Sequence, residues 1–391
     1  MSISKRCRDI TPFLVMELNE KAEAMEKAGQ SVIRMCVGEP DFDTPACINR
    51  ASCRALEAGR THYTHSLGIL ELREAIAEDY RTRYGVTVDP ANIAVTQGTS
   101  PAMLSLFSTI LEQGDKVITS DPCYACYDNF INFAGGEPVK VPVSEDDGFQ
   151  YRVSAIRKAL DENSDIKAIL INSPANPTGT LLSKERMQAI AELAEERDIW
   201  VVSDEIYHGL VYEGTEHSIL EFTDKAFVLN GFSKAYAMTG WRLGYLIAPP
   251  HFMRTLQNLC QNFFISANTM AQWGGVAALT EAQPDVERMR DTYNKRRVYL
   301  IKRLKDMGFT IKHEPTGAFY ALVNMRHLAE KFGGSSLELA YDILEKAKIA
   351  VTPGIDFGQG AEGFIRFSYA TSMENIEEGM NRLEGYLKAD A

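Results

Sequence analysis

Lys234 is flanked by small residues in the segment 231–244, and Arg242 follows it eight positions later. An amine can form a Schiff base with an aldehyde, and a serine hydroxyl or a guanidinium can hold a phosphate. Upstream, an apolar run ends in Asp204, and a buried carboxylate can keep a pyridine nitrogen protonated by charge pairing. These are the chemical demands of pyridoxal phosphate. The alternative for Lys234 is a solvated surface position, where most lysines lie.

Residues 92–102 read as a strand that enters a helix through a tight turn of small residues. Gly98 and Thr99 form the turn, and Ser100 and Pro101 suit the cap and first turn of the helix. Free amides at a helix start, with the positive end of the helix dipole, form an anion site. A plain capped turn would have the same sequence. The segment has no Gly-x-Gly-x-x-Gly or Walker pattern, so it indicates neither a dinucleotide nor ATP.

Two further polar residues follow apolar runs that read as strands. Asp204 lies where one such strand ends, and ligands of α/β sheets bind beyond these ends. A helix cap or a surface acid is the alternative for it. Asn176 lies between two prolines in a turn that closes at Gly179, so its amide points in a defined direction. That amide could donate to a phenolate-type oxygen, and a simple turn asparagine is equally compatible.

The apolar pattern predicts an α/β fold with a largely parallel sheet flanked by helices. Buried strands are expected at 92–96, 116–120, 168–172, 200–204, 226–230 and 243–248, and helices at 100–112, 153–161 and 183–197. Near the N-terminus, Thr11 and Pro12 predict a helix start, and Gly29 predicts its stop.

From about residue 284 the pattern changes to one long amphipathic helix, with Val286, Met289, Tyr293, Leu300 and Leu304 spaced for one side. Strands near 318–323 and 363–369 and helices near 335–347 and 374–388 then predict a smaller α+β domain. We therefore expect four parts: an N-terminal arm with part of the small domain (1–40), a large cofactor-binding domain (41–283), a connecting helix (284–308) and a small C-terminal domain (309–391).

Composition excludes several classes of protein. The net charge of the 391 residues is -12, which disfavours a nucleic-acid or anionic-membrane surface. No apolar run approaches the ~20 residues that span a bilayer, and the apolar patch at 12–16 is too short for a secretory signal. Seven cysteines, an odd number, argue against a disulfide framework. A cytoplasmic enzyme is expected.

Two local patterns could suggest metal or redox chemistry. Cys123 and Cys126 have Cys-x-x-Cys spacing, but no second pair of ligands is evident, so we expect no metal site. A redox role is weakly supported by the motif alone. His62 and His65 are three residues apart in a segment that reads as a loop, where they would not share a helix face.

The ordered set of motifs resembles the class I and II aminotransferases, the fold-type I pyridoxal phosphate enzymes. The blocks are Asn-Pro-Thr-Gly at 176–179, Ser-Asp-Glu-Ile-Tyr at 203–207, the lysine block at 231–244 and the arginine block at 363–368. The resemblance extends from about Gly38 to Ser372 and is strongest to the bacterial and archaeal aspartate-aminotransferase-like branch. It implies that Lys234 forms the Schiff base and later carries the proton.

The resemblance also implies a role for each residue around the cofactor. Asp204 would pair with the pyridinium nitrogen, and Tyr207 and Asn176 would hydrogen-bond the phenolic oxygen. The phosphate would be held at the turn and the lysine block, by Gly98, Thr99, Ser100, Ser233 and Arg242. Tyr124 would stack on the ring, which places Cys123 and Cys126 beside a stacking residue. Tyr63 would reach the phosphate of a neighbouring subunit, which implies a homodimer with shared active sites.

For the substrate, the resemblance implies that Arg366 binds the α-carboxylate, with Gly38 and Asn176 beside it. The expected reaction moves an amino group between an L-amino acid and a 2-oxo acid, such as 2-oxoglutarate, in ping-pong turnover. In the aspartate branch a lysine often occupies the position of Ser100, and the arginine that another branch takes from its partner subunit has no counterpart in residues 263–270. Basic residues of the N-terminal arm could bind a side-chain carboxylate instead. An aspartate-, alanine- or aromatic-type donor therefore remains open.

Three other functions share some features with an aminotransferase. A fold-type I C–S β-lyase shares the cofactor residues, because the choice of reaction lies in the substrate pocket. A nicotinamide dehydrogenase would need the glycine fingerprint that this chain lacks. A ligand-sensing regulator would need a basic DNA-binding segment, and none is evident in this acidic chain.

Overall fold

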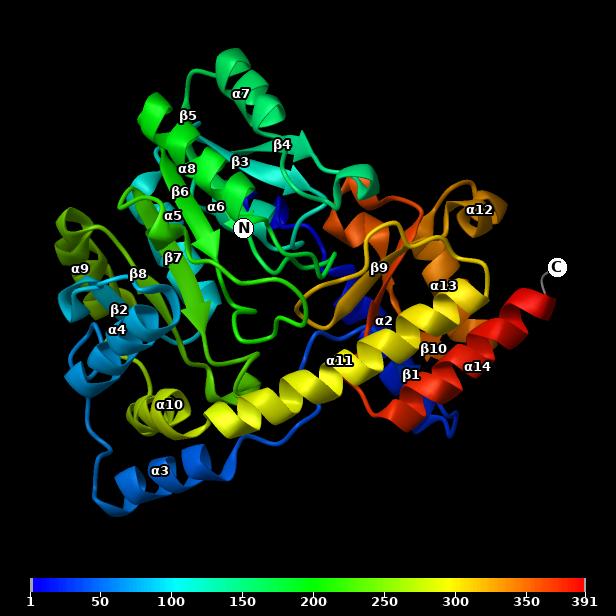
Figure 1. Ribbon diagram of the computed structural model, residues 1–391, viewed down its shortest axis with the longest axis horizontal. Helices are drawn as coiled ribbons and strands as arrows, with labels where there is room; N and C mark the ends of the chain where they lie inside the picture. Colours follow the sequence, from blue (N-terminus) through cyan, green and yellow to red (C-terminus); the bar gives the residue numbers. More distant parts are fainter. Residues whose placement is uncertain (1–2, 390–391) are drawn as a thin grey trace.

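The computed structural model describes residues 3–389, and their main feature is one large sheet (Figure 1). Within that range the sheet has seven strands in the order β2-β8-β7-β6-β5-β3-β4. Its strands are β2 (Ile93–Thr96), β3 (Lys116–Asp121), β4 (Glu137–Pro142), β5 (Ile166–Asn172), β6 (Trp200–Asp204), β7 (Ala226–Gly231) and β8 (Gly244–Ile247). β8 runs antiparallel to both of its neighbours and the other pairs are parallel. The predicted fold class is confirmed.

Helices cover both faces of this sheet (Figure 1). They are α4 (Leu70–Tyr84), α5 (Thr99–Ile110), α6 (Tyr127–Phe133), α7 (Val153–Glu162), α8 (Lys184–Arg197) and α9 (Met253–Phe263), while α3 (Ala46–Glu57) packs against α10 (Thr269–Glu281). Successive residues of β5 alternate between two cores: Leu170 packs in the cluster of Met103, and Ile169 packs in the other. Both faces are thus buried, which explains why the central strands are almost continuously apolar.

The edge strand β4 was not predicted from the sequence. Residues Glu137 to Pro142 comprise two charged residues, two prolines and two valines. Prolines are tolerated at a sheet edge, where one side of the strand needs no ladder hydrogen bonds. The apolar signal that marks the central strands is therefore absent from this one.

The cap of α5 lies two residues before the predicted position. Gly98, with φ of 98°, occupies the cap position, so the helix begins at Thr99 and Ser100 lies inside its first turn. The hydroxyl of Thr96 donates to the Gly98 carbonyl at 2.8 Å. A Cβ on Gly244 would lie 2.8 Å from the Gly98 carbonyl carbon, so β8 passes directly against this turn. Backbone proximity, which the local sequence does not reveal, selects glycine here.

The N-terminal part contains α1 (Lys5–Arg8) and α2 (Leu14–Lys27). The prediction that Thr11 caps α2 was wrong, because its hydroxyl donates to Asn129 instead. The first amides of α2, those of Leu14 and Val15, donate to the Asp356 carboxylate at 2.9 and 3.2 Å. The cap is therefore supplied by a residue from the opposite end of the chain.

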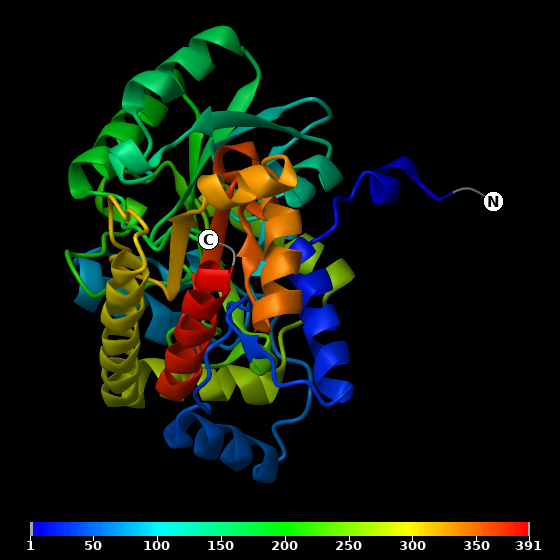
Figure 2. The same cartoon turned by 90° about the vertical axis from the view of Figure 1, so that its right-hand side faces the viewer.

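The long helix α11 (Gln283–Asp306) leads into the C-terminal part (Figures 1 and 2). Its expected inward residues Val286, Met289, Tyr293, Leu300 and Leu304 are all buried. The following elements are β9 (Tyr320–Asn324), α12 (Arg326–Ala329), α13 (Ser336–Ala347), β10 (Ile349–Ala350), β11 (Thr352–Pro353), β12 (Phe364–Ser368) and α14 (Met373–Ala389). The four expected strands and helices of this part are thus present.

An early segment of the chain joins this C-terminal part. β12 lies between β11 and β9 in an antiparallel sheet, and β1 (Ile33–Arg34) pairs with β10. Residues near the N-terminus thereby join the C-terminal elements. The division into four parts stays a prediction, and residues 1–2 and 390–391 lie outside the described residues. From residue 3 to residue 389, no helix has the length and apolar character needed to cross a bilayer.

Candidate active site

A cavity of about 260 Å³ lies beyond the carboxyl ends of β5, β6 and β7. Small-molecule sites usually enclose ~300–1,000 Å³. Its walls come from the large sheet and from both ends of the chain: Phe13, Val15, Met16, Val37, Gly38, Thr99, Ser100, Met103, Tyr124, Tyr127, Asn172, Asn176, Asp204, Ile206, Tyr207, Ser233, Lys234, Thr239, Arg242, Tyr320 and Arg366. Most of the residues expected from the sequence to form a site are therefore in one place.

Lys234 follows β7, so its side chain enters the cavity from the end of a central strand. Its Nζ donates to the Gly38 carbonyl at 2.6 Å. Burial lowers the pKa of Lys234 to about 8, and Arg366 and Arg242 lower it further against the opposing charge of Glu39. An amine with this pKa is partly neutral near pH 8, and the neutral amine is the nucleophile and the base.

Asp204 is the last residue of β6 and is 3% exposed. One carboxylate oxygen accepts from the Tyr127 hydroxyl at 2.6 Å, and the other accepts from the Ile206 amide at 3.2 Å. Burial raises the pKa of Asp204 to about 6, while the Tyr127 hydrogen bond opposes that rise. A cation placed beside this carboxylate would stabilise its ionised form. Tyr127 was not expected from the sequence, because a tyrosine at a helix start gives no distinct signal.

The start of α5 and Arg242 form a positively charged end of the cavity. No side chain caps α5, so its first amides remain available to a ligand. A Cβ on Gly98 would lie 2.7 Å from Nη2 of Arg242, which shows how closely the guanidinium approaches the turn. Nη1 of Arg242 donates to the Thr239 carbonyl at 3.0 Å. Together with Ser233, these groups can bind an anion such as a phosphate.

Arg366 lies on β12 and is 3% exposed. Nη1 donates to Asn176 Oδ1 at 2.8 Å, and Nη2 donates to the Cys36 carbonyl at 2.6 Å and to Thr352 at 3.1 Å. Nε has no hydrogen-bond partner among the described residues. The guanidinium is therefore fixed in direction and retains donor capacity, which suits a ligand carboxylate.

Tyr320, on β9, connects several of these groups and was missed by the sequence reasoning. Its hydroxyl and that of Tyr207 are 2.8 Å apart, and the Arg366 guanidinium lies over its ring at 4.3 Å. A Cβ on Gly38 would lie 1.8 Å from the Tyr320 hydroxyl, so only glycine fits there. An aromatic residue in an apolar strand normally indicates core packing, and this explains the omission.

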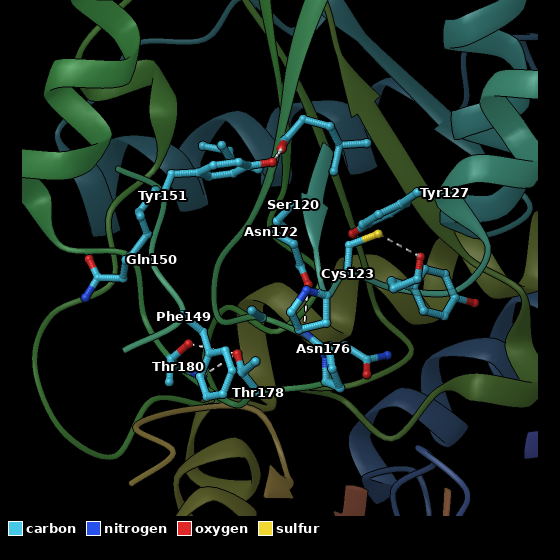
Figure 3. A pocket seen from close by; sticks show the side chains of 17 residues that line it. Ser120, Cys123, Tyr127, Phe149, Gln150, Tyr151, Asn172, Asn176, Thr178 and Thr180 are labelled. Carbon is cyan, nitrogen blue, oxygen red and sulfur yellow. Dashed lines mark hydrogen bonds between the residues drawn. The ribbon is translucent and has the colours of Figure 1, made fainter. Parts of the chain in front are cut away.

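Tyr124 follows β3 and lines the cavity. Its ring is edge-on to Phe13, with centroids 6.1 Å apart, and edge-on to Tyr127 at 5.3 Å. A second, smaller cavity shares this wall, and Figure 3 shows Cys123 and Asn172 on one side of it with Tyr151 opposite. Tyr124 is thus held by rings on two sides, which leaves its orientation well defined.

Asn172, also unexpected from the sequence, positions two predicted residues. Its Oδ1 accepts from the Asn176 amide at 2.8 Å, and its Nδ2 donates to the Asp204 carbonyl at 2.9 Å. The first of these bonds is visible in Figure 3. Asn172 is the last residue of β5, so it joins the ends of two neighbouring strands. The only sequence signal was its place at the end of an apolar run.

The cysteine pair of this region lacks the features of a reactive site. Cys123 is buried, and burial raises the pKa of its thiol to about 12 although Lys140 opposes the rise. The thiolate, which is the reactive form, is therefore disfavoured. Burial also raises the pKa of Cys126. Across residues 3–389, no group of three or more potential metal ligands gathers.

Among the predicted site residues, Gly98 lies against Arg242 and does not itself line the cavity. Tyr63 also lies outside the cavity. It is 81% exposed, in the loop between α3 and α4. The neighbouring His62 and His65 are in the same loop, as expected. The His62 carbonyl accepts from the Thr269 hydroxyl at 2.8 Å. Within one subunit, Tyr63 therefore contributes nothing to the cavity.

Comparisons with known proteins agree with this geometry. The chain is 40% identical over 389 residues to the (5-formylfuran-3-yl)methyl phosphate transaminase of Methanocaldococcus jannaschii, covering 98% of this chain and 99% of that protein. It is 39% identical over 393 residues to the aspartate aminotransferase of Pyrococcus horikoshii, covering 99% and 98%. A solved single mutant of Thermus thermophilus aspartate aminotransferase superimposes with a TM-score of 0.92 at 38% identity, covering 98% of this chain and 99% of that one.

The family model for aminotransferase class I and II matches residues 30–383, nearly the whole chain. Enzymes of this family depend on pyridoxal phosphate, so the predicted cofactor is confirmed. The lysine, the buried aspartate and the uncapped helix start line one cavity, in agreement with that match. The chain belongs to the class I and II aminotransferases.

Proposed function

We propose that this aminotransferase moves an amino group between an L-amino acid and a 2-oxo acid, such as 2-oxoglutarate, by ping-pong turnover. One observation carries the proposal. The amine of Lys234, the carboxylate of Asp204 and the guanidinium of Arg366 line a single cavity that also holds an uncapped helix start. An amine, an electron sink and a carboxylate-binding site are the requirements of transamination.

The residues present fit pyridoxal phosphate. Arg242, Ser233 and the amides of Thr99 and Ser100 would bind its phosphate, where Gly98 leaves room for the guanidinium. At the opposite end, Asp204 would pair with the ring nitrogen, because its buried carboxylate lacks a cationic partner among the groups that hydrogen-bond it. The donor sets at the two ends therefore match the two polar ends of the cofactor.

Three further residues would orient the ring between those ends. Tyr207 and Asn176 would hydrogen-bond its phenolic oxygen, since Tyr320 and Arg366 already fix their other polar contacts. Tyr124, held edge-on by Phe13 and Tyr127, would offer its face for stacking.

When bound, the cofactor supplies an aldehyde that captures amino groups and a ring that withdraws electrons from Cα. Lys234 would attach the cofactor at rest and be released by the incoming amine. Its Nζ, with a pKa lowered to about 8 by burial, would then take the proton from Cα and return it at C4′, the former aldehyde carbon of the cofactor. Asp204 would hold the proton on the ring nitrogen throughout, and Tyr207 would support the neighbouring oxygen.

Arg366 would bind the α-carboxylate of the amino acid, with Gly38 and Asn176 beside it. The guanidinium is fixed by the Cys36 carbonyl, Thr352 and Asn176. A planar, permanently charged group orients a carboxylate bidentately and so fixes Cα relative to Lys234. The same contact serves the 2-oxo acid in the return half-reaction, because both substrates carry this carboxylate.

We also propose a homodimer in which Tyr63 reaches the phosphate of the neighbouring subunit. Apolar side chains are exposed in the arm and around the Tyr63 loop: Ile3 is 67% exposed, Phe263 75% and Tyr63 81%. The arm before α2 extends away from the rest of the molecule (Figure 2), and its helix α1 has no buried residue. A second copy of the chain would cover these groups.

Replacement of Lys234 by alanine tests the proposal. The holoenzyme is expected to be yellow, to bleach with an amino donor and to recover with a 2-oxo acid. Lys234→Ala should lose this half-transamination by at least about 1,000-fold, because the attachment and proton-transfer group is gone. Lys225→Ala, at the opposite end of β7, is the matched control and should keep it.

Full turnover by Lys234→Ala would contradict the mechanism. A C–S β-lyase is distinguished by its products: ammonia and pyruvate from a cysteine conjugate, without bleaching by any donor, would contradict transamination. Stopped-flow absorbance of the bound cofactor measures the first outcome, and a coupled ammonia assay measures the second.

A further inference from the structure

We infer that the preferred amino donors carry large apolar or aromatic side chains rather than a side-chain carboxylate. This inference rests on the proposed function and names the substrate class of the same site. It is carried by the distribution of charge and apolar surface around the cavity.

Each cationic group of the cavity already has a task. Among the described residues that line it, the cationic side chains are Lys234, Arg242 and Arg366. Lys234 attaches the cofactor, Arg242 lies at the anion-binding turn, and Arg366 is placed for the α-carboxylate. A second carboxylate on the substrate would therefore lose its hydration without gaining its own cation, and that is strongly unfavourable.

The negative charge of Glu39 also disfavours a donor with a side-chain carboxylate. Thr239 lines the cavity, and its hydroxyl donates to the carboxylate of Glu39. Glu39 is also close enough to raise the pKa of Lys234. A donor with a negatively charged side chain would meet this carboxylate, whereas a neutral side chain would not.

Part of the cavity wall is apolar, and we place the substrate side chain against it. Phe13, Val15 and Met16 approach from the start of α2, and Met103 approaches from α5. The Phe13 ring packs edge-on against Tyr124 with centroids 6.1 Å apart. An apolar pocket discriminates by about 10- to 200-fold for each methylene group of the substrate, so this wall favours bulky apolar donors over alanine.

Hydrogen bonds from another part of the fold hold the segment that carries this apolar wall. Asp356 accepts the Leu14 and Val15 amides at 2.9 and 3.2 Å and so fixes the segment that carries the wall. The next residue, Phe357, lies under the Arg366 guanidinium at 4.8 Å. The apolar wall and the α-carboxylate site are thereby held by adjacent residues, so a bound amino acid would span a fixed distance between them.

Residues 263–270 of the proposed partner subunit would bring no cation to the cavity. Residues 263–270 lie next to the turn, because the Ser266 carbonyl accepts from the Gln97 side chain at 2.9 Å. This segment, Phe-Phe-Ile-Ser-Ala-Asn-Thr-Met, contains neither lysine nor arginine. A partner that brought the same segment to the cavity would add apolar surface and no cation.

The first test compares donors on the holoenzyme. Single-turnover bleaching is measured by stopped flow with L-phenylalanine, L-leucine, L-alanine, L-aspartate and L-glutamate. We expect the second-order rate constants for phenylalanine and leucine to exceed that for aspartate by about tenfold or more. Equal or faster bleaching by aspartate or glutamate would overturn the inference.

The second test adds a cation to the wall. Met16 is 46% exposed, so a longer polar side chain can be accommodated there. Met16→Arg should raise the aspartate-to-phenylalanine ratio of rate constants by about tenfold or more. Met16→Gln, neutral and of similar length, should lower the phenylalanine rate without raising the aspartate rate. Equal gains for aspartate in both variants would overturn the charge argument.

Two measurements keep the outcomes separate. The absorbance of the bound cofactor and the Tm of each variant show whether the fold and the cofactor site are intact. If no amino acid bleaches the cofactor, the proposed function itself fails. If aspartate is preferred, transamination stands and the inference on side-chain class is overturned.

Discussion

At the residue scale, the reactive properties of this site come from burial combined with a few specific contacts. Burial lowers the pKa of Lys234 and raises that of Asp204, so the two groups approach each other in proton affinity. In water, an aspartate and a lysine differ by ~6.5 pKa units. In the folded protein, the pKa of Asp204 is about 6 and that of Lys234 is about 8. Each group therefore titrates closer to neutral pH than it would in water.

The pKa of Lys234 predicts a pH profile for cofactor attachment. Only the neutral amine attacks the aldehyde, so attachment to the cofactor-free protein should accelerate about tenfold per pH unit below pH 8. Above a pKa of about 8 the rate should level off, because the amine is then mostly neutral. Stopped-flow absorbance after mixing with pyridoxal phosphate measures this. A rate that keeps rising to about pH 10, as for an ordinary lysine, would contradict the assigned pKa.

Asp204 offers a second test, in which activity and stability change in opposite directions. Its folded-state pKa of about 6 lies above the ~3.9 of an unfolded chain. The ionised carboxylate therefore destabilises the cofactor-free protein above pH 6, and this penalty disappears below about pH 4. Asp204→Asn should raise the Tm of the cofactor-free protein at pH 8 by a few degrees.

The same variant should slow half-transamination by about 100-fold or more, because the ring nitrogen loses its charged partner. Calorimetry and stopped flow measure the two effects on one preparation. Tyr127→Phe serves as a comparison, since it removes one hydrogen bond to Asp204 and leaves the charge. A lower Tm together with unchanged activity in Asp204→Asn would contradict both assignments.

At the element scale, the parallel strands bring the site together, and α2 closes it. β5, β6 and β7 end beside one another, with Asn172 opposite Asp204 in register. Chemical groups that follow these strands meet because parallel strands finish at the same edge of the sheet. α2 adds the apolar wall, and its position depends on the Asp356 cap.

Removal of that cap should weaken both the fold and the substrate site. Asp356→Ala leaves the Leu14 and Val15 amides without their acceptor, so the free energy of unfolding should fall by about 1–2 kcal/mol. Phe13 and Val15 would then be less firmly held, and kcat/KM for phenylalanine should fall. Urea unfolding of the cofactor-free protein and steady-state kinetics measure these effects.

Asp356→Asn is the matched variant, because its amide oxygen still accepts one of the two hydrogen bonds. Its loss of stability should lie between those of the original protein and Asp356→Ala. Identical urea midpoints for all three proteins would contradict the capping role.

At the scale of the whole molecule, the described chain leaves Tyr63 and the apolar side chains Ile3 and Ile10 of the N-terminal arm exposed. If the proposed homodimer forms, Tyr63→Phe removes one hydrogen bond to the partner's cofactor phosphate. We expect the dimer to persist and the dissociation constant of the cofactor to rise about tenfold, as for the loss of a charge-assisted hydrogen bond. Light scattering and fluorescence titration measure these two quantities.

Tyr341→Phe is the matched control, because Tyr341 lies on α13 beside Lys21 and away from the cavity. It should bind the cofactor as the original protein does. A monomer in solution, or unchanged cofactor binding by Tyr63→Phe, would contradict the shared site.

The sequence determined the fold class and most of the site. Central strands of a covered parallel sheet are continuous apolar runs, and their ends mark where ligands bind. Lys234, Asp204 and Asn176 follow such runs within one to a few residues, so local patterns were sufficient to propose them. β4 was missed because an edge strand with prolines does not carry that apolar signal.

Only the tertiary structure decided which distant groups complete the site. Tyr127 is 77 residues from Asp204, Tyr320 is 113 from Tyr207, and Asp356 is 342 from Leu14. No local periodicity encodes such pairs, because hydrogen bonds between distant residues depend on how the elements pack. The sequence thus indicated the cofactor, through short-range patterns at strand ends and through the resemblance of the ordered motifs to the class I and II aminotransferases. The placement of α2, β9 and β12 at the ends of the large sheet's strands decided the shape of the cavity and brought Arg366 into it.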